Sequence, residues 1–385
     1  TAGGNSDDTG YGNFFYDVPA GFLAMCSGNL PVADAVDPAQ TEDNIPQELF
    51  FMSDYNGNLT GRTITTENQP DLLMIRHWTT GQNWYTLDSN RVITDNKYIL
   101  TNTTGAEATL PQANITSVGA TSVGISSGTW LNSTGATYQM WMWRANGGTT
   151  STNSSGSINV TQQVDPSGGF SISTYSDTAG TPTIGHGLSS APTFVIVKQT
   201  NGTHNWAVYA AGAGATKYGF LESTSGFGTD NMWGNTTPTD TLVYLGVYTQ
   251  TSGSGRNYVA YCFADTEGYI KSGYFEGNGN TNGPFVYTGF RPSLVMRRRI
   301  DGSGSWLVKD DARNPTNDGS IEVLTWNNDG AENPQAETSD GVDFLSNGFK
   351  LTDSDGSVNG SGGTYIYMAF GQSLVGSNNV PCTAR

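Results

Sequence analysis

The sequence is poor in positive charge and in charged residues altogether. Lysine and arginine number 17 against 34 aspartate and glutamate residues, which gives a formal net charge of −17, and charged residues make up 13% of the 385 residues. Nucleic-acid-binding proteins carry a basic footprint, so this balance argues against a nucleic-acid partner. No apolar run approaches the roughly 18 residues that span a bilayer, which argues against membrane insertion.

Cysteine is nearly absent. The three cysteines, Cys26, Cys262 and Cys382, are an odd number and lie far apart, so they build neither a disulfide framework nor a zinc spacing. Cys262 lies in an apolar run and is predicted to be a small core residue. The chain begins with threonine and shows no signal-peptide pattern, so we expect a processed or trimmed product.

What the sequence does have is glycine and aromatic residues: 50 Gly, 9 Trp, 18 Tyr and 16 Phe. Such a supply of large apolar side chains argues against intrinsic disorder. Alanine, glutamate, lysine and leucine, which dominate coiled coils and helical bundles, are scarce. This composition is typical of all-β proteins.

One pattern occurs three times. A proline opens a run of apolar residues that ends in a base, and a tryptophan follows the proline by 14 residues: Pro70 and Trp84, Pro192 and Trp206, Pro292 and Trp306. An aromatic segment then closes each repeat, at 138–143, 258–263 and 365–370. A fixed core with variable loops indicates duplication of a folded module.

Each repeat is predicted to consist of strands. The run after the proline is short enough for a buried strand, and with the polar turn and the tryptophan segment it predicts a hairpin. Opening strands are expected at 50–52, 170–175 and 273–275, and no segment has a sustained 3.6-residue period. The predicted fold class is all-β: tandem antiparallel β-sandwich modules with Gly/Asn-rich loops and very little helix.

The composition divides the chain into modules and linkers. We expect β modules at 48–148, 169–264 and 265–371, linkers at 32–47 and 149–168, N-terminal strands at 1–31 and a C-terminal tail at 372–385.

Several segments carry a resemblance to a known group of proteins. They read FSI at 170–172, IGHGL at 184–188, VIVK at 195–198, YVAYCFA at 258–264, GPFVYTGFRP at 283–292, DFLSNGFKL at 343–351 and GGTYIYMAF at 362–370. These segments resemble a repeat that is widespread in virion proteins of tailed phages, especially phages of marine bacteria. The resemblance covers about 160–371 closely and 48–148 loosely, and residues 9–31 are similar to the end of a lectin-like sandwich that often precedes the repeats.

The resemblance implies a virion structural protein and the C-terminal part of a longer polypeptide. We expect a tail-fibre or spike component at the surface of the extracellular particle that presents β-sandwich modules for attachment to a host-surface glycan or protein. Two alternatives stay open: a capsid or tail decoration protein with a purely structural role, and a secreted glycan-binding, lectin-like adhesin. Phage fibres as a group are trimers, and aromatic strand edges invite partner strands. We therefore expect a homo-oligomer, with a trimer favoured, in contact with other virion proteins.

Nothing in the sequence predicts a catalytic centre. Among the three histidines, His186 lies in a Gly-His-Gly turn, where a structural role is expected. No Ser, Cys or carboxylate has the context of a Ser/His/Asp triad, and no carboxylate pair recurs from module to module as glycosidases would need. We expect no enzymatic activity, no cofactor and no metal, and the ligand-binding residues stay unassigned.

Three further features have competing interpretations. The run 353–357 imitates the start of a calcium loop, but position 12 is Thr364 instead of glutamate, which favours an Asx turn and leaves calcium as the alternative. The acid pairs at 7–8 and 310–311 are predicted to be solvated. The segment 226–231 is predicted to be a loop in which replacement of Phe227 and Asp230 leaves the melting temperature within a few degrees. The repeated tryptophans could form a sugar-stacking platform, but their constant offset from a buried strand favours a core role between the sheets of each module.

Overall fold

The structure is a computed structural model, which describes residues 5–8, 10, 14–24, 49–112, 114–166, 168–177, 180–313, 317, 323–332 and 341–372. Strands account for 42% of the chain and helices for 3%, so the predicted all-β fold with very little helix is confirmed. The helical segments are α2 (Thr129–Asn132), η3 (Ser89–Arg91) and η4 (Ile93–Asp95). The predicted linker 32–47, the predicted tail from 373 onward, Cys26 and Cys382 lie outside the described residues.

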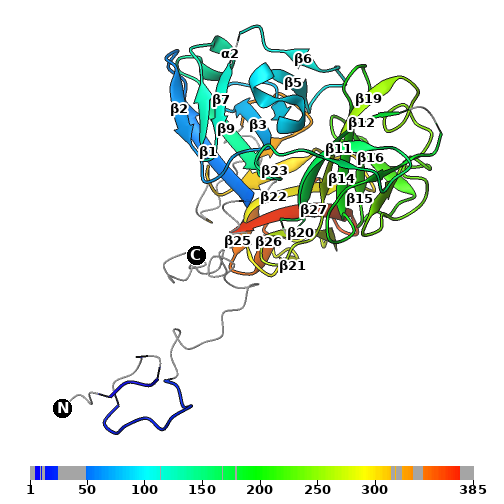
Figure 1. Cartoon of the computed structure of the whole chain (residues 1–385). Coiled ribbons are helices and arrows are strands. Elements are labelled where there is room, and N and C mark those ends of the chain that lie inside the picture. Colours follow the sequence, from blue (N-terminus) through cyan, green and yellow to red (C-terminus); the bar gives the residue numbers. More distant parts are fainter. Residues whose placement is uncertain are drawn as a thin grey trace.

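Three successive sets of strands, which we call the first, second and third unit, repeat one pairing scheme (Figure 1). The first unit contains β1 (Phe50–Asn56), β2 (Arg62–Thr65), β3 (Leu72–His77), β4 (Tyr85–Asp88), β5 (Lys97–Leu100), β6 (Ala108–Thr109), β7 (Ile115–Gly119), β8 (Ser122–Ile125) and β9 (Thr137–Trp143). The second contains β10 (Ser151–Asn153), β11 (Val160–Asp165), β12 (Phe170–Asp177), β13 (Thr183–Gly185), β14 (Phe194–Gln199), β15 (Ala207–Ala210), β16 (Lys217–Phe220), β17 (Gly228–Thr229), β18 (Leu242–Tyr244) and β19 (Arg256–Phe263). The third contains β20 (Ile270–Glu276), β21 (Phe285–Tyr287), β22 (Arg291–Arg299), β23 (Leu307–Asp310), β24 (Leu324–Thr325), β25 (Val342–Leu345), β26 (Gly348–Leu351) and β27 (Thr364–Gln372).

In every unit the aromatic closing strand lies between the opening strand and the strand that follows the repeated proline. β9 pairs with β1 and β3, β19 with β12 and β14, and β27 with β20 and β22, all antiparallel. The strand after the repeated tryptophan pairs with the proline strand, so the predicted hairpins are confirmed. Both edges of each closing strand are thus already paired within the chain, so these aromatic strands offer no free edge to a partner strand.

A smaller sheet covers one face of each large sheet. These sheets have the orders β2-β8-β7, β13-β18 and β21-β26-β25. Between the two sheets of each unit lies an apolar core, to which the closing strands contribute alternate residues such as Met140 in the first unit and Cys262 in the second. Each unit is therefore a β-sandwich, and the prediction that Cys262 is a core residue is confirmed.

The linker predicted at 149–168 was wrong for most of its length. β10 pairs with β11, and β11 pairs with β12, so this segment extends the large sheet of the second unit. Its Ser, Thr and Asn side chains were interpreted as linker composition. An outer strand with one exposed face has the same polar composition, and pairing partners alone distinguish the two.

The remaining faces of the three large sheets meet in one core that all units share (Figure 1). The last aromatic residues of the closing strands touch one another there: Trp143 and Phe370 have ring centroids 5.5 Å apart, Phe263 and Phe370 5.8 Å, and Trp143 and Phe263 6.5 Å. Because both faces of a large sheet are covered, nearly every side chain of its closing strand is buried instead of every second one. The three sandwiches thus form one body around a pseudo-threefold axis.

Candidate functional site

The repeated tryptophans lie in the shared core. Trp84, Trp206 and Trp306 are almost fully buried, which confirms the core prediction and excludes a sugar-stacking platform at these positions. They fill the space between units, however, and not the space between the two sheets of their own unit. Their indole Nε1 atoms donate to backbone carbonyls of a neighbouring unit: Trp84 to Thr325 (2.8 Å), Trp306 to Phe220 (2.9 Å) and Trp206 to Leu100 (2.9 Å). These bonds run from the first unit to the third, from the third to the second and from the second to the first, and they close a ring.

A buried cation packs over each of these indoles, six residues after the repeated proline. Arg76 Cζ lies 5.4 Å from the ring centroid of Trp84, Lys198 Nζ 6.0 Å from that of Trp206 and Arg298 Cζ 4.7 Å from that of Trp306. The three cations also donate to backbone carbonyls of the neighbouring unit, at Thr325 and Asn328, at Thr104, and at Ser223 and Ser225 respectively. Burial lowers the pKa of both arginines to about 10 and that of Lys198 to about 8. The cations therefore join neighbouring units and are not available to a ligand.

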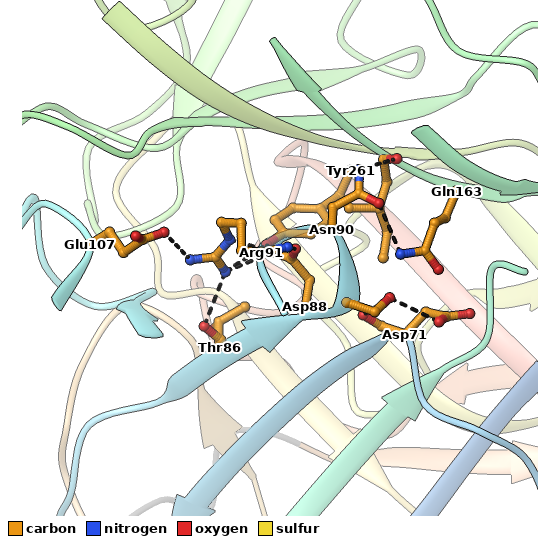
Figure 2. Close-up of polar contacts among 10 residues, drawn as sticks. Asp71, Thr86, Asp88, Asn90, Arg91, Glu107, Gln163 and Tyr261 are labelled. Atoms are coloured by element: carbon orange, nitrogen blue, oxygen red, sulfur yellow. Dashed lines mark hydrogen bonds and ion pairs between the residues drawn. The ribbon is translucent and has the colours of Figure 1, made fainter. Parts of the chain in front are cut away.

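An ion network lies where the first unit meets the second (Figure 2). Arg91 Nε donates to Asp88 (2.7 Å) and Nη1 to Glu107 (3.0 Å), and the hydroxyl of Tyr261 in the second unit donates to Asp88 (2.6 Å). Asn90 reinforces the junction, since its Nδ2 donates to the carbonyl of Ile172 (3.1 Å). Burial alone would lower the pKa of Arg91, but its anionic neighbours raise it above its usual value. Every charge in this network has a partner, which points to a structural role.

The third unit repeats this network, and the second does not. Asp310 and Arg313 form a buried ion pair (2.6 Å), and Arg313 also binds Glu332. The prediction that 310–311 are solvated acids was therefore wrong, because Arg313 covers Asp310 and Arg291 binds Asp311 (2.7 Å).

The corresponding positions of the second unit are apolar: Ala210, Ala213 and Phe227. The ring of Phe227 lies 6.1 Å from that of Trp306 and occupies space above Gly219, where a Cβ would overlap it. Phe227 therefore packs against the shared core, which argues against the expectation that its replacement has little effect on stability, whereas Asp230 is exposed.

Other residues weighed in the sequence also have structural roles. His186 is buried, with Nδ1 accepting from the backbone N–H of Leu188 (3.2 Å) and Nε2 3.1 Å from the carbonyl of Thr239. Asp353 and Asp355 each accept a hydrogen bond from the backbone N–H two residues later, at 2.8 and 2.7 Å, as the Asx-turn prediction requires. At the N-terminal acid pair, Asp7 is buried and accepts from the backbone N–H of Ala24 (2.7 Å), whereas Asp8 is exposed.

The described residues lack both a metal-binding cluster and a membrane-spanning helix. They contain no group of three or more His, Cys, Asp or Glu side chains placed to hold a metal ion. No helix within them is long and apolar enough to cross a membrane.

An open groove on the first unit has the features of a ligand site. Its volume is about 430 Å³, and it lies where β3 ends at His77 and the α2 segment precedes β9. We call it the Trp130 groove, and it is lined by His77, Thr80, Gln82, Thr129, Trp130, Ser133 and Tyr138. The indole of Trp130 is 43% exposed, although tryptophan is usually well buried. An exposed indole surrounded by hydroxyls and an amide can stack a flat apolar ring and bond its polar edge.

The groove is held in place by buried neighbours. Tyr85 meets Trp130 edge-on at 6.0 Å between ring centroids. Asn132, buried behind the groove, donates to the carbonyls of Thr60 (2.8 Å) and Ser126 (2.7 Å) and fixes the loop that carries Trp130. Between Thr80 and Gln82, which line the other side of the groove, a Cβ at Gly81 would overlap the backbone carbonyl of Asp329, so the third unit packs directly against this segment. The groove itself is lined by residues of the first unit alone.

Sequence reasoning missed this groove. Trp130 has no counterpart in the other two units. A prediction based on positions that all three units share therefore does not include it. A usable signal was present, namely a tryptophan between Gly128 and Asn132 in a Ser/Thr-rich loop outside every predicted strand.

A protein-family model described as "Domain of unknown function (DUF7483)" matches residues 46–373. The chain belongs to this family. The match runs through all three units without a break, as expected of a body with one shared core. No curated protein matches the chain, and no solved structure does.

Proposed function

We propose that this protein is a structural component of a tailed-phage virion, a tail-fibre or spike part that attaches to the host surface. The virion assignment is supported by the resemblance of its repeats to those of phage virion proteins. Attachment, as opposed to a purely structural role, is supported by one observation: a preformed groove that is lined by hydroxyls, an amide and a half-exposed tryptophan.

The architecture suits such a role. Three sandwiches around one core form a rigid platform, and rigid platforms hold a recognition surface in its binding geometry without an ordering cost. A net charge of −17 keeps such a body soluble and does not favour nonspecific binding to nucleic acid.

The homotrimer expected from phage fibres stays part of this proposal. In this chain the closed ring of indole bonds already joins three similar units. A trimer would therefore be built from contacts other than the aromatic strands. Analytical ultracentrifugation of the purified chain at micromolar concentration measures this directly, and a stable monomer would contradict the trimer for the isolated chain.

The location of the chain on intact particles tests the function. Antibodies against the purified chain, applied to phage particles that encode it, should label the tail tip. Purified chain should also reduce adsorption of the phage to its host. Label on the capsid shell with no effect on adsorption would favour the decoration alternative. A chain found only in the culture medium and absent from particles would overturn the proposal in favour of a secreted adhesin.

A further inference from the structure

We propose that the Trp130 groove is a carbohydrate subsite that binds one uncharged hexopyranose residue, with the sugar ring stacked on Trp130. This inference rests on the proposed function only for its biological meaning, since sugar binding is a property of the isolated chain.

The polar groups of the groove match a polyol. Thr80, Thr129 and Ser133 provide hydroxyls, which both donate and accept, and Gln82 provides an amide that does the same from two separate atoms. A pyranose offers an apolar face of C–H groups and a rim of hydroxyls. An aromatic plane bordered by such side chains is complementary to both parts at once.

The indole of Trp130 is presented in a fixed orientation. The Tyr138 hydroxyl accepts from the backbone N–H of Ser133 (3.0 Å), and the Tyr55 hydroxyl donates to the carbonyl of Leu131 (2.6 Å). Both bonds tie the chain on either side of Asn132, whose own amide is bonded as described above. A ligand therefore meets a binding surface that needs no ordering, which increases affinity for a given set of contacts.

The groove contains no group that would recognise a charged sugar. None of its lining residues is Asp, Glu, Lys or Arg. Its one histidine, His77, has a lowered pKa because of burial and the nearby Arg76, and both effects disfavour a positive charge on the ring. Its two ring nitrogens lie 2.8 Å from Thr79 Oγ1 and 3.0 Å from Thr80 Oγ1. The acidic chain as a whole repels polyanions.

The same end of the other two units is occupied by their own side chains. Where β14 ends and β19 begins, Arg256 donates to Gln199 (2.8 Å) and lies 2.9 Å from Nε2 of His204. Where β22 ends, Arg299 is bonded to Asp301 (2.7 Å) and to the carbonyl of Gly356 (3.0 Å). These arginines use their own neighbours as partners, so we assign the sugar subsite to the first unit.

Binding to defined glycans tests the inference. The purified full chain is applied to an array of neutral and acidic glycans, and then titrated with the methyl glycosides of glucose, galactose and mannose under saturation-transfer-difference NMR. We expect binding to at least one neutral series, with saturation transfer strongest at the C–H protons of one sugar face. No binding to any neutral glycan, or a preference for acidic ones, would overturn the inference.

Variants locate the binding in the groove. Trp130→Ala should weaken affinity at least tenfold, Trp130→Phe should retain part of it, and Thr129→Val, which removes a hydroxyl at nearly constant shape, should weaken it several-fold. Phe285→Ala is the matched control, because Phe285 is 46% exposed on β21, outside the groove, and should leave binding unchanged. Unchanged affinity in a Trp130→Ala protein with a wild-type melting curve would refute the assignment.

The outcomes separate this inference from the proposed function. A chain that binds neutral sugar through Trp130 but is absent from virions supports the subsite and removes the phage assignment. A chain located at the tail tip whose adsorption to host cells is insensitive to Trp130→Ala supports the virion role and removes the subsite.

Discussion

The junction between the first and second units and the junction between the second and third share one backbone geometry but differ in chemistry. Glu107 N–H donates to the carbonyl of Thr200 (2.8 Å) at one, and Phe227 N–H donates to the carbonyl of Ile300 (2.8 Å) at the other. Beside the first bond lie Arg91 and its two carboxylates, and beside the second lie alanines and the ring of Phe227.

The volume at the two junctions is filled in opposite ways. In the first unit Ile99 occupies the β5 position next to the ion network, while in the second unit the matching β16 position is Gly219, over which Phe227 lies. The third unit follows the first, with Leu324 beside Arg313 and Glu332. Buried ion networks and apolar packing of similar volume are often close in free energy, because desolvation offsets the Coulombic gain. The closed ring of three units therefore requires filled space and polar groups with hydrogen-bond partners at each junction, and it does not require charged side chains.

The largest expected effect concerns what all junctions share. Trp206→Ala should lower the free energy of unfolding by about 3–5 kcal/mol, since it opens a cavity in the shared core and removes the indole donor to the Leu100 carbonyl. The loss should appear as a single shifted transition in urea, monitored by circular dichroism, because one core joins the units. Trp130→Ala is the control and should move the midpoint little. A transition that splits, with two units unfolding at the wild-type midpoint, would contradict the shared core.

Breaking the ion network from one side should be nearly as damaging. Arg91→Met leaves Asp88 buried without its cation, which should lower the free energy of unfolding by about 3 kcal/mol. Urea titration at neutral pH measures this. Arg299→Met removes an arginine whose ion pair with Asp301 is partly exposed, and should change stability by at most about 1 kcal/mol. Equal effects of the two substitutions would show that burial of the network adds nothing to the stability of the protein.

Removing the apolar filler should have a smaller effect. Phe227→Ala should lower the free energy of unfolding by about 2 kcal/mol, less than a fully buried phenylalanine, because the ring is only partly covered. No neighbour can fill the space, since Gly219 has no side chain. Asp230→Ala, in the same loop, should stay within about 0.5 kcal/mol of the wild type. A Phe227→Ala protein that melts like the wild type would support the sequence-based expectation that this loop contributes little to stability.

Replacing the side chains of the first junction by those of the second should change the free energy of unfolding only a little. A combined variant gives the first junction the side chains of the second, which are Ala210, Ala213, Gly219, Phe227 and Met368. Its substitutions are, in the same order, Asp88→Ala, Arg91→Ala, Ile99→Gly, Glu107→Phe and Tyr261→Met. We expect this protein to lie within about 2 kcal/mol of the wild type and above Arg91→Met alone, since no unpaired charge remains. A combined variant less stable than Arg91→Met would show that the charges themselves hold the first junction.

The smallest effect depends on pH. The folded-state pKa of Lys198, lowered by burial to about 8, lies below that of an unfolded lysine, near 10.4. Between these values the unfolded state binds the extra proton, so the stability contributed by this site rises with pH. Relative to Lys198→Arg, the wild type should gain about 1 kcal/mol between pH 7 and 9. Paired urea titrations of the two proteins at several pH values measure the difference. A constant difference across this range would mean that Lys198 stays charged in the folded protein.

Much of the fold could be predicted because it follows from local sequence patterns. The run of apolar residues after Pro192 and the aromatic run 258–263 are strands on composition and length alone, and the constant spacing to Trp206 predicted both the repeat and its buried tryptophan. These features depend on neighbours a few residues away. The polar strands β10 and β11 were missed because polar strands and linkers share a composition.

The sequence by itself determined the all-β class, the three-fold repeat and the burial of its tryptophans. Only the tertiary structure decided that the units close around one core, that Arg76, Lys198 and Arg298 are buried beneath carbonyls of a neighbouring unit, and that Trp130 stays partly exposed. The physical reason is that a run of apolar residues reports that both faces of a strand are covered, but not what covers them. The partners of each cation and the two walls of the Trp130 groove, at 77–82 and 129–138, come from segments far apart in the chain, and folding alone brings them together.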